Sequence, residues 1–315
     1  MSRLLPMLIS GTGLSEHDVL TIVRNAPVRY KTYPILKRNG GERLISQPAR
    51  ELKALQRVLV ENFLSQLPVH PAATAYRAGV SIKDNAGAHA HNGPILKFDF
   101  KDFFPSITSR DWQAYCKQKS LFDEANDIWI STNIFFHRPP GSRSLRLAIG
   151  APSSPSLSNV LMNDFDTQIT EMVRRDKVTY TRYADDLTFS AKRTGFLTGV
   201  ERGLRKKLRE IDSPSLTLNP LKTVRATTKY KRVVTGLVLT NDKRVSLGHE
   251  RKRRIRAALH YELHGKLTLQ KRAELAGLLA FVRDVEPAFF TKLETKYGVD
   301  LIRGLKSAIV PRSMR

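Results

Sequence analysis

Apolar and polar positions follow helical spacing at the start of the chain and then change to the spacing of strands. The first thirty residues and the segment Pro48–Leu64 predict helices, because their apolar residues recur every three or four positions. The β-rich runs Tyr30–Ile35 and Arg43–Ser46 flank Asn39-Gly40-Gly41, which predicts a β-hairpin. The buried side of the second helix is expected to hold Leu52, Leu55, Val58, Leu59 and Phe63.

The middle of the chain mixes short strands with helices, which predicts an α+β fold. Ile95–Phe100 is a short apolar strand, and Pro152–Val173 is mostly helical after an opening rich in Gly, Pro and Ser. Val178–Tyr183 and Leu187–Ala191 are β-rich runs that leave only a short turn between them. This arrangement predicts an antiparallel hairpin supported by helices.

The pattern changes again near the C-terminus. Val233–Leu239 predicts one strand, paired with Arg244–Leu247 across Asn241-Asp242. From Gly248 onward only helical spacing remains, so we expect two domains, 1–247 and 248–315. The first helix of the second domain is expected to cover His249–His264 and to pack through Ile255, Leu259 and Leu263. Two more helices are expected at Leu267–Val285 and Pro287–Tyr297.

Charge points to a polyanionic partner. The 315 residues hold 53 Lys and Arg against 29 Asp and Glu, a formal net charge of +24. Such an excess favours nucleic acid, although a basic protein can also be merely soluble. The single cysteine excludes a disulfide framework and fits the cytoplasm. No apolar run is long enough to span a membrane, and the N-terminal run is interpreted as a helix start rather than a signal peptide.

Three carboxylates are the strongest candidates for chemistry. Asp185 and Asp186 lie at the tip of the predicted hairpin, within Tyr183-Ala184-Asp185-Asp186, and Asp99 ends an apolar strand. Taken alone, each has an ordinary structural explanation, because Asp is common in turns and at strand ends. If they converge, they repel one another and favour two Mg²⁺ ions, or Mn²⁺, as in phosphoryl transfer. A third element, Gly150 to Pro155, is a turn entering a helix where backbone can approach a ligand.

In this order and spacing, the elements resemble the palm motifs of reverse transcriptases. The resemblance implies a right-hand polymerase fold, with fingers and palm built from an antiparallel sheet plus helices and with a helical thumb. It implies that Asp99, Asp185 and Asp186 are catalytic and that metal is held by these residues and Phe100. Phe104 falls where the family has an aromatic gate against the ribose 2′-OH, which implies dNTP substrates, while core packing would also explain it.

Further motifs resemble retron reverse transcriptases in particular. They are Asn85 and His89 of an Asn-Ala-x-x-His element, Val234-Thr235-Gly236, Asn219 to Thr223, and Glu51 to Gln56. The resemblance implies a structured non-coding RNA partner, priming from an RNA 2′-OH and a branched RNA–DNA product. It also implies anti-phage defence with an effector protein encoded alongside. The residues expected to bind RNA or primer are Asn85, His89, Thr235, Gly236, Arg251, Arg253 and Arg254.

The expected nucleotide site draws on separate parts of the chain. Its residues are Arg43, Arg50, Asp102, Phe103, Phe104, Gly150 and Lys222. Arg43 and Arg50 suit phosphate oxygens through their guanidinium groups, but they would also serve as ordinary surface charge. One departure from the family pattern is Ile149, where a glutamine is usual. An apolar side chain cannot make that glutamine's hydrogen bonds.

Two other functions remain open at this point. An RNA-dependent RNA polymerase or a group II intron-like reverse transcriptase would share the metal aspartates. Alternatively, the protein could work mainly as an RNA-binding scaffold that restrains an effector, with its basic C-terminal helices as a binding surface. The incorporation of dNTP against rNTP separates the polymerases, and an Asp185 and Asp186 double variant separates scaffold from enzyme.

Overall fold

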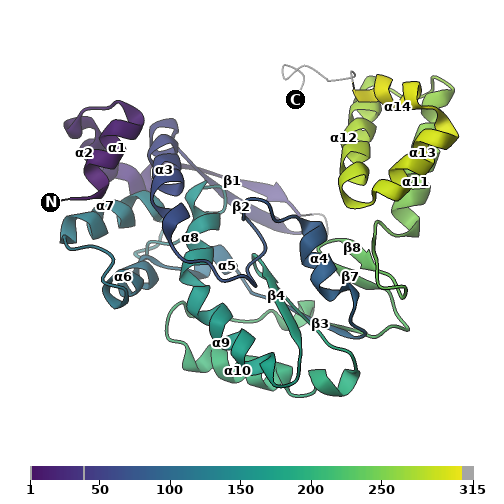
Figure 1. Cartoon of the computed structure of the whole chain (residues 1–315). Helices are drawn as coiled ribbons and strands as arrows, with labels where there is room; N and C mark the ends of the chain where they lie inside the picture. The colour runs from purple at the N-terminus through teal and green to yellow at the C-terminus, as the bar shows by residue number, and fades with distance from the viewer. Residues whose placement is uncertain (1, 38–39, 307–315) are drawn as a thin grey trace. The chain divides into compact units, whose positions relative to one another are not determined.

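The computed structural model describes residues 2–37 and 40–306, and these residues form two compact units (Figure 1). Of the described residues, the first unit contains 2–37, 40–80, 96–189 and 195–225, and the second contains 81–95, 190–194 and 226–306. The expected boundary at residue 247 does not coincide with this division. Residues 81–95 and 226–247 cluster with the C-terminal helices because they share an apolar core with them.

The first unit begins with a helical group and a hairpin. Helices α1 (Leu4–Thr12), α2 (Glu16–Asn25) and α7 (Ala125–Phe135) pack on one another, and α1 also packs on α3 (Arg50–Asn62) (Figure 1). The side of α3 predicted from its apolar spacing is buried. The remaining helices of this unit are α5 (Phe103–Ser106), α6 (Ser109–Gln118), α8 (Ser153–Leu161), α9 (Asn163–Arg174) and α10 (Val200–Glu210), with short 3-10 turns η1 (Ala26–Val28), η2 (Leu64–Gln66), η3 (Thr194–Leu197) and η4 (Pro220–Lys222).

The predicted N-terminal hairpin is confirmed. Strands β1 (Tyr30–Leu36) and β2 (Glu42–Pro48) pair antiparallel, with Tyr30 opposite Pro48. Its turn is closed by Lys37, whose backbone N–H donates to the carbonyl of Gly41 at 2.9 Å. Asn39, part of the predicted turn, lies outside the described residues.

A four-stranded sheet carries the predicted catalytic hairpin. Its strand order is β4 (Thr179–Tyr183), β5 (Asp186–Ser190), β3 (Ile95–Asp99) and β6 (Val224–Ala226). The hairpin β4–β5 and the strand β3 confirm the strands expected from the sequence. Because β3 is the neighbour of β5, the end of β3 is brought beside the hairpin tip.

One strand prediction was wrong. Val233–Leu239 is not a single strand: β7 (Arg232–Val234) and β8 (Leu237–Leu239) pair with each other antiparallel, and β9 (Val245–Ser246) pairs with β8. Thr235 and Gly236 form the turn between β7 and β8, both with positive φ, 47° and 78°. Two consecutive residues with positive φ suit a tight hairpin turn. The sequence alone shows only a continuous β-rich run here.

The second unit encloses its own apolar core. Its helices are α4 (Ile82–Ala90), α11 (His249–Leu263), α12 (Leu269–Val285), α13 (Pro287–Tyr297) and α14 (Val299–Lys306). The core joins α4 and the β7–β9 sheet to these C-terminal helices through Ala86, Val234, Leu237, Ile255, Leu259, Leu279, Val282 and Leu293. Ile255 and Leu259 are buried as expected, but Leu263 is 54% exposed, because α11 ends there and the chain turns away.

Candidate nucleotidyl-transfer site

The hairpin tip and the end of β3 are joined by a backbone hydrogen bond. The N–H of Phe100 donates to the carbonyl of Asp185 at 3.1 Å, so Asp99 is held beside Asp185 and Asp186. Ala184 adopts a positive φ of 56°, which completes the two-residue turn of the hairpin. The three carboxylates predicted to converge therefore come together at one edge of the sheet.

The electrostatics of this cluster are those of crowded, partly buried carboxylates. Burial raises the pKa of Asp185 to about 6, and the nearby charges of Asp99 and Asp186 add to the shift. Burial also raises the pKa of Asp186, an effect that Lys97 opposes and Asp99 reinforces. Such a group of like charges is relieved by a cation, and oxygen ligands favour Mg²⁺ or Mn²⁺. The donor set therefore fits the divalent ions expected from the sequence.

Lys222 provides the cation that Asp99 meets in this structure. Its Nζ donates to both carboxylate oxygens of Asp99, at 2.8 and 2.9 Å, and this contact raises the pKa of Lys222. The lysine is placed by the segment before it: the N–H of Asn219 donates to the carbonyl of Asp99 at 2.7 Å. Within the described residues, no group of three or more His, Cys, Asp or Glu side chains is arranged so that it could hold a metal ion, and Asp99 contacts this ammonium instead.

The turn at Gly150 lies directly against the N-terminal hairpin. The N–H of Ser46 in β2 donates to the carbonyl of Ile149 at 2.8 Å. Gly150 has φ +118°, and a Cβ there would lie 2.9 Å from Cγ2 of Ile45 and 3.1 Å from the carbonyl oxygen of Ser46. Glycine is therefore required by both conformation and space.

The other predicted nucleotide residues fall into three environments. Phe104 lines a cavity with Ile149 and Gly150, while Phe103 is buried and stacked on Phe100 at 5.7 Å. Asp102 is exposed at the start of α5 with φ 46°. Arg43 is exposed on β2, whereas Arg50 lines a different hollow, between α1 and α3. A nucleotide contact by these residues stays a prediction.

Sequence reasoning did not find two residues of this region. Tyr76 lines the same cavity as Phe104, and Arg182 of β4 is completely buried in an ion pair with Asp166, with Nη2 to Oδ2 at 2.7 Å. Tyr76 follows a loop without a recognisable motif, and Arg182 occupies a position that looks like any strand residue. No local sequence signal distinguishes either one.

The retron-like motifs meet inside the second unit. Nδ1 of His89 lies 2.6 Å from Oγ of Ser190, and the amide of Asn85 donates to Oγ1 of Thr235 at 3.5 Å. Thr235 in turn donates to the carbonyl of Ile82 at 3.0 Å. Asn85 and His89 are buried, so these contacts fasten α4 to the β7–β8 turn through Thr235 and to Ser190 through His89. Their predicted contact with RNA stays a prediction, and the accessible part of this region is the turn itself.

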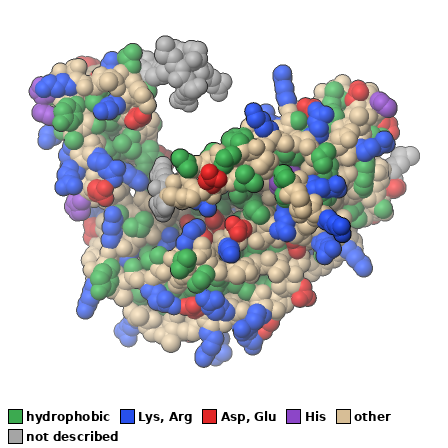
Figure 2. All heavy atoms as spheres, turned by 180° about the vertical axis from the view of Figure 1, so that it is seen from behind, with side chains coloured by type: hydrophobic (Ala, Val, Ile, Leu, Met, Phe, Trp, Pro, Cys, Tyr) green, Lys and Arg blue, Asp and Glu red, His purple; other side chains and the backbone are tan. Residues whose placement is uncertain are grey.

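The arginines of α11 lie next to aromatic rings or at the surface. Arg251 stacks over the ring of Phe281 at 5.5 Å and approaches Gly236, while Arg253 and Arg254 are exposed. Lys and Arg side chains also recur across the face of the molecule seen in Figure 2. An exposed basic surface of this kind suits phosphodiester backbone.

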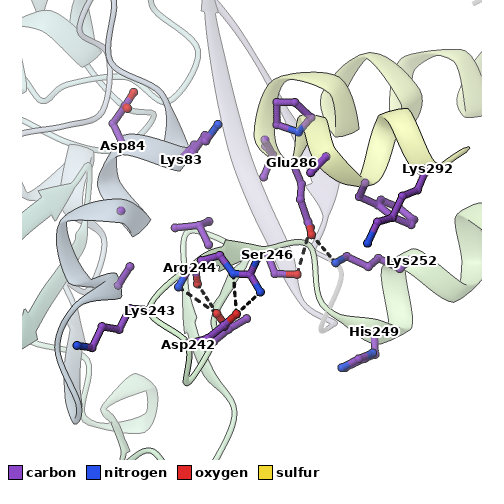
Figure 3. Close-up of a pocket in the computed structure, with 18 of the residues that line it drawn as sticks. Lys83, Asp84, Asp242, Lys243, Arg244, Ser246, His249, Lys252, Glu286 and Lys292 are labelled. Atoms are coloured by element: carbon purple, nitrogen blue, oxygen red, sulfur yellow. Dashed lines mark hydrogen bonds and ion pairs between the residues drawn. The ribbon is translucent and has the colours of Figure 1, made fainter. Parts of the chain in front are cut away.

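A pocket in the second unit, which we call the basic pocket, gathers further cations. Its lining includes six Lys or Arg and three Asp or Glu: Lys83, Lys243, Arg244, Lys252, Arg256 and Lys292, with Asp84, Asp242 and Glu286. Figure 3 shows that Glu286 is joined to Ser246 and Lys252, and Asp242 to Arg244. The remaining lining cations keep the pocket positive.

Fold and site together define the class of protein. A sheet with an aspartate at the end of one strand and two at the tip of the adjacent hairpin is the palm of a right-hand nucleic-acid polymerase. No helix among the described residues is long and apolar enough to cross a membrane.

Comparison with known proteins narrows that class. Residues 35–250 match the family described as reverse transcriptase (RNA-dependent DNA polymerase). The retron Ec83 reverse transcriptase of Escherichia coli is 37% identical over 293 residues, covering 92% of this chain and 94% of that protein. The retron Mx65 reverse transcriptase of Myxococcus xanthus is 34% identical over 287 residues, covering 87% and 66%. The chain belongs to the reverse transcriptase family, among the retron reverse transcriptases, and is an RNA-directed DNA polymerase.

A solved structure supports the fold independently. Telomerase from Candida albicans, determined with the TWJ fragment of telomeric RNA, superposes with a TM-score of 0.51 at 14% identity. The match covers 88% of this chain and 61% of that chain. At this identity the likeness concerns the fold alone, and it confirms the right-hand polymerase architecture expected from the sequence.

Proposed function

We propose that this polymerase copies part of a structured non-coding RNA into DNA and leaves the product joined to that RNA as a branched molecule. The observation that carries the proposal is the convergence of Asp99, Asp185 and Asp186 in a chain that matches retron reverse transcriptases along almost its whole length. Synthesis starts from a 2′-OH of the same RNA. The proposal includes a role in anti-phage defence with an effector protein, which rests on the retron resemblance.

The carboxylates and Lys222 have different roles at the site: the carboxylates bind metal, and Lys222 binds phosphate. Asp99 and Asp185, with the backbone carbonyl of Phe100, would hold two Mg²⁺ or Mn²⁺ ions, and Asp186 would add negative charge beside them. Lewis-acid stabilisation of the attacking and leaving oxygens comes from these ions when they are bound. Lys222, released from Asp99, turns its ammonium to the nucleotide phosphates. Catalysis is then mostly positioning and charge stabilisation.

The sugar and triphosphate are held by the first unit. Phe104 closes the space that a ribose 2′-OH would need and so selects dNTP. Gly150 lines the same cavity as Phe104, and its lack of a side chain lets this turn fit against β2. Arg43, exposed on β2, supplies a guanidinium for the phosphates.

The RNA partner is held by the second unit. Arg253 and Arg254 are exposed on α11, and the basic pocket adds cations from α4, the β8–β9 turn and α13. Structured RNA is recognised mainly through its backbone and shape, which such a surface suits. Buried Asn85 contributes by holding the Thr235-Gly236 turn, and buried His89 contributes by fixing α4 to Ser190.

The decisive experiment compares the wild type with a variant that carries Asp185→Asn and Asp186→Asn. Protein is purified from cells that express it with its neighbouring RNA, and the bound nucleic acid is sequenced. It is also treated with a debranching enzyme, which separates the DNA from the RNA only where a 2′–5′ branch joins them. We expect a covalent RNA–DNA molecule from the wild type and only RNA, bound with similar affinity, from the variant. The matched control carries Asp176→Asn and Asp212→Asn, two exposed aspartates outside the site. Linear RNA alone from the wild type would contradict the proposal, and unchanged phage resistance in the variant would favour a scaffold.

A further inference from the structure

The loop that carries Tyr76 is attached to the catalytic hairpin. The N–H of Arg182 in β4 donates to the carbonyl of Ala72 at 2.7 Å, and the N–H of Thr74 donates back to the carbonyl of Arg182 at 2.9 Å. The carbonyl of Ala75 accepts from the amide of Asn159 in α8 at 2.8 Å. Three backbone groups immediately before Tyr76 are thus fixed to the same framework that presents Asp185.

A buried ion pair supports both features at once. Arg182 donates to both carboxylate oxygens of Asp166, and its Nη1 donates to Oδ1 of Asn159 at 3.2 Å and to the carbonyl of Ala184 at 3.2 Å. The guanidinium therefore connects the Tyr76 loop, through Asn159, with the tip of the hairpin, through Ala184. Because each partner is fully buried, this support has little freedom to shift.

Tyr76 itself has two features that folding does not require. Its backbone has a positive φ of 60°, which is strained for a bulky residue, and its side chain is 50% exposed. The ring lies 6.5 Å from that of Phe104, at an angle of 48°, and both rings line one cavity with Ile149 and Gly150. Strain combined with exposed aromatic surface is typical of a ligand contact.

The charged groups near Tyr76 agree with a nucleotide ligand in the cavity that it shares with Phe104. Burial raises the pKa of its phenol, Asp185 and Tyr183 raise it further, and Arg43 lowers it. The phenol therefore lies within the field of a catalytic carboxylate and of the β2 arginine. Under the proposed function, an incoming nucleotide contacts both the carboxylates and Arg43 of β2. The ring of Tyr76 lies near both, so we assign its contact to the incoming nucleotide.

We propose that Tyr76 is a further dNTP-binding residue of the polymerase, whose ring forms with Phe104 the aromatic recess that receives the incoming dNTP. The inference rests on the proposed nucleotide role of Phe104. Ile149, in place of the usual glutamine, gives this recess an apolar wall. Isoleucine cannot donate a hydrogen bond to the nucleotide as a glutamine amide can, so contact with the rings of Tyr76 and Phe104 takes its place in this proposal. Aromatic contact of this kind is sequence-tolerant, as a polymerase needs, because every nucleotide presents an apolar face.

Steady-state kinetics on a supplied primer and RNA template test the proposal. We expect Tyr76→Ala to raise KM for dNTP about tenfold, since one ring contact is worth about 1.4 kcal/mol, while kcat changes less than about threefold. Tyr76→Phe keeps the ring and is expected to stay near the wild-type KM. Tyr230→Ala, which removes a 71% exposed tyrosine in the second unit, is the matched control and is expected to leave KM unchanged.

Binding of the primer–template duplex and thermal unfolding are measured for the same variants. A KM for dNTP within twofold of the wild type in Tyr76→Ala would overturn the inference, and so would a weaker duplex affinity with an unchanged KM. If the wild type extends no primer, both the proposed function and this inference are contradicted. If the wild type is active and Tyr76→Ala has the same KM, only this inference is contradicted.

Discussion

The ammonium of Lys222 contacts both carboxylate oxygens of Asp99, although 123 residues separate the two in the chain. Divalent ions require the same oxygens, so a bound ion and the Lys222 contact compete. The proposed function gives Lys222 two positions: the contact with Asp99 in this structure, and a proposed one near the nucleotide phosphates after substrate binds. Substrate phosphates would draw the lysine away and open Asp99 to metal.

Lys222→Ala should separate the two roles. Without nucleotide, the variant is expected to bind Mn²⁺ about tenfold more tightly, because a competing cation has been removed. With nucleotide, its KM for dNTP should rise about tenfold, because a phosphate contact is lost. Titration of Mn²⁺ by electron paramagnetic resonance and primer-extension kinetics measure the two effects. Lys206→Ala, on the exposed surface of α10, should change neither, and weaker Mn²⁺ binding by Lys222→Ala would argue against competition.

Gly150→Ala is expected to damage the protein through strain and a clash with β2. A positive φ costs an alanine about 1 kcal/mol or more, and its Cβ would press on Ile45 and on the carbonyl of Ser46. We expect the free energy of unfolding to fall by about 1–3 kcal/mol and the rate of primer extension to fall by about tenfold or more. The contrasting variant is Gly277→Ala, inside α12 with open space around it, which should stabilise by about 0.5–1 kcal/mol. Equal stability of the two variants would contradict this account.

The part of the site that is encoded locally could be predicted from the sequence. Asp185 and Asp186 follow a β-rich run and precede another, and Asp99 ends an apolar strand, so the hairpin and the position of Asp99 beside it were predicted correctly. The Lys222 contact with Asp99 could not be identified, because it depends on how distant segments meet. The same is true of the strain at Tyr76, which no residue pattern near it indicates.

Errors arose where local pattern and backbone conformation disagree. Thr235 was placed inside a strand because a β-branched residue after two valines normally favours one, but its positive φ makes it a turn residue. Leu263 falls on the apolar spacing of α11, yet the helix ends at that residue and its side chain is exposed. In both cases tertiary structure overrides a correct local preference.

The Asp166–Arg182 pair predicts a large loss of stability when only one partner changes. Asp166→Asn leaves a buried guanidinium without a counter-charge and weakens the bond from Tyr180, whose hydroxyl donates to Asp166 at 2.7 Å. We expect the free energy of unfolding in urea to fall by about 3–5 kcal/mol. The double change Asp166→Leu with Arg182→Met should cost less than Asp166→Asn.

A surface pair provides the matched comparison. Glu171 and Arg174 form an ion pair on α9 with both side chains mostly exposed. Glu171→Gln is expected to change the free energy of unfolding by less than about 0.5 kcal/mol. If Asp166→Asn were equally mild, the buried pair would not be the support that connects the Tyr76 loop with the hairpin.

His137 predicts a specific sensitivity to acid. Its imidazole is buried beside the ring of Tyr30, at 5.1 Å, and burial lowers its pKa from 6.5 to about 4. Above pH 6.5 the group is neutral in both folded and unfolded chains and has no effect on stability. As the pH falls from 6.5 towards 4, the unfolded chain takes up a proton that the folded chain refuses, so stability is lost.

His137→Gln should remove that loss while leaving the packing largely intact. Between pH 7 and pH 5, the wild type is expected to lose about 1–2 kcal/mol more of its unfolding free energy than the variant does. This value is smaller than the full pKa shift of His137 would give, because the site is only partly desolvated. Urea unfolding at the two pH values measures it. His17→Gln, an exposed histidine on α2, should show the same pH dependence as the wild type. If His137→Gln also follows the wild type, His137 takes up its proton in the folded state, and the acid sensitivity of the chain arises elsewhere.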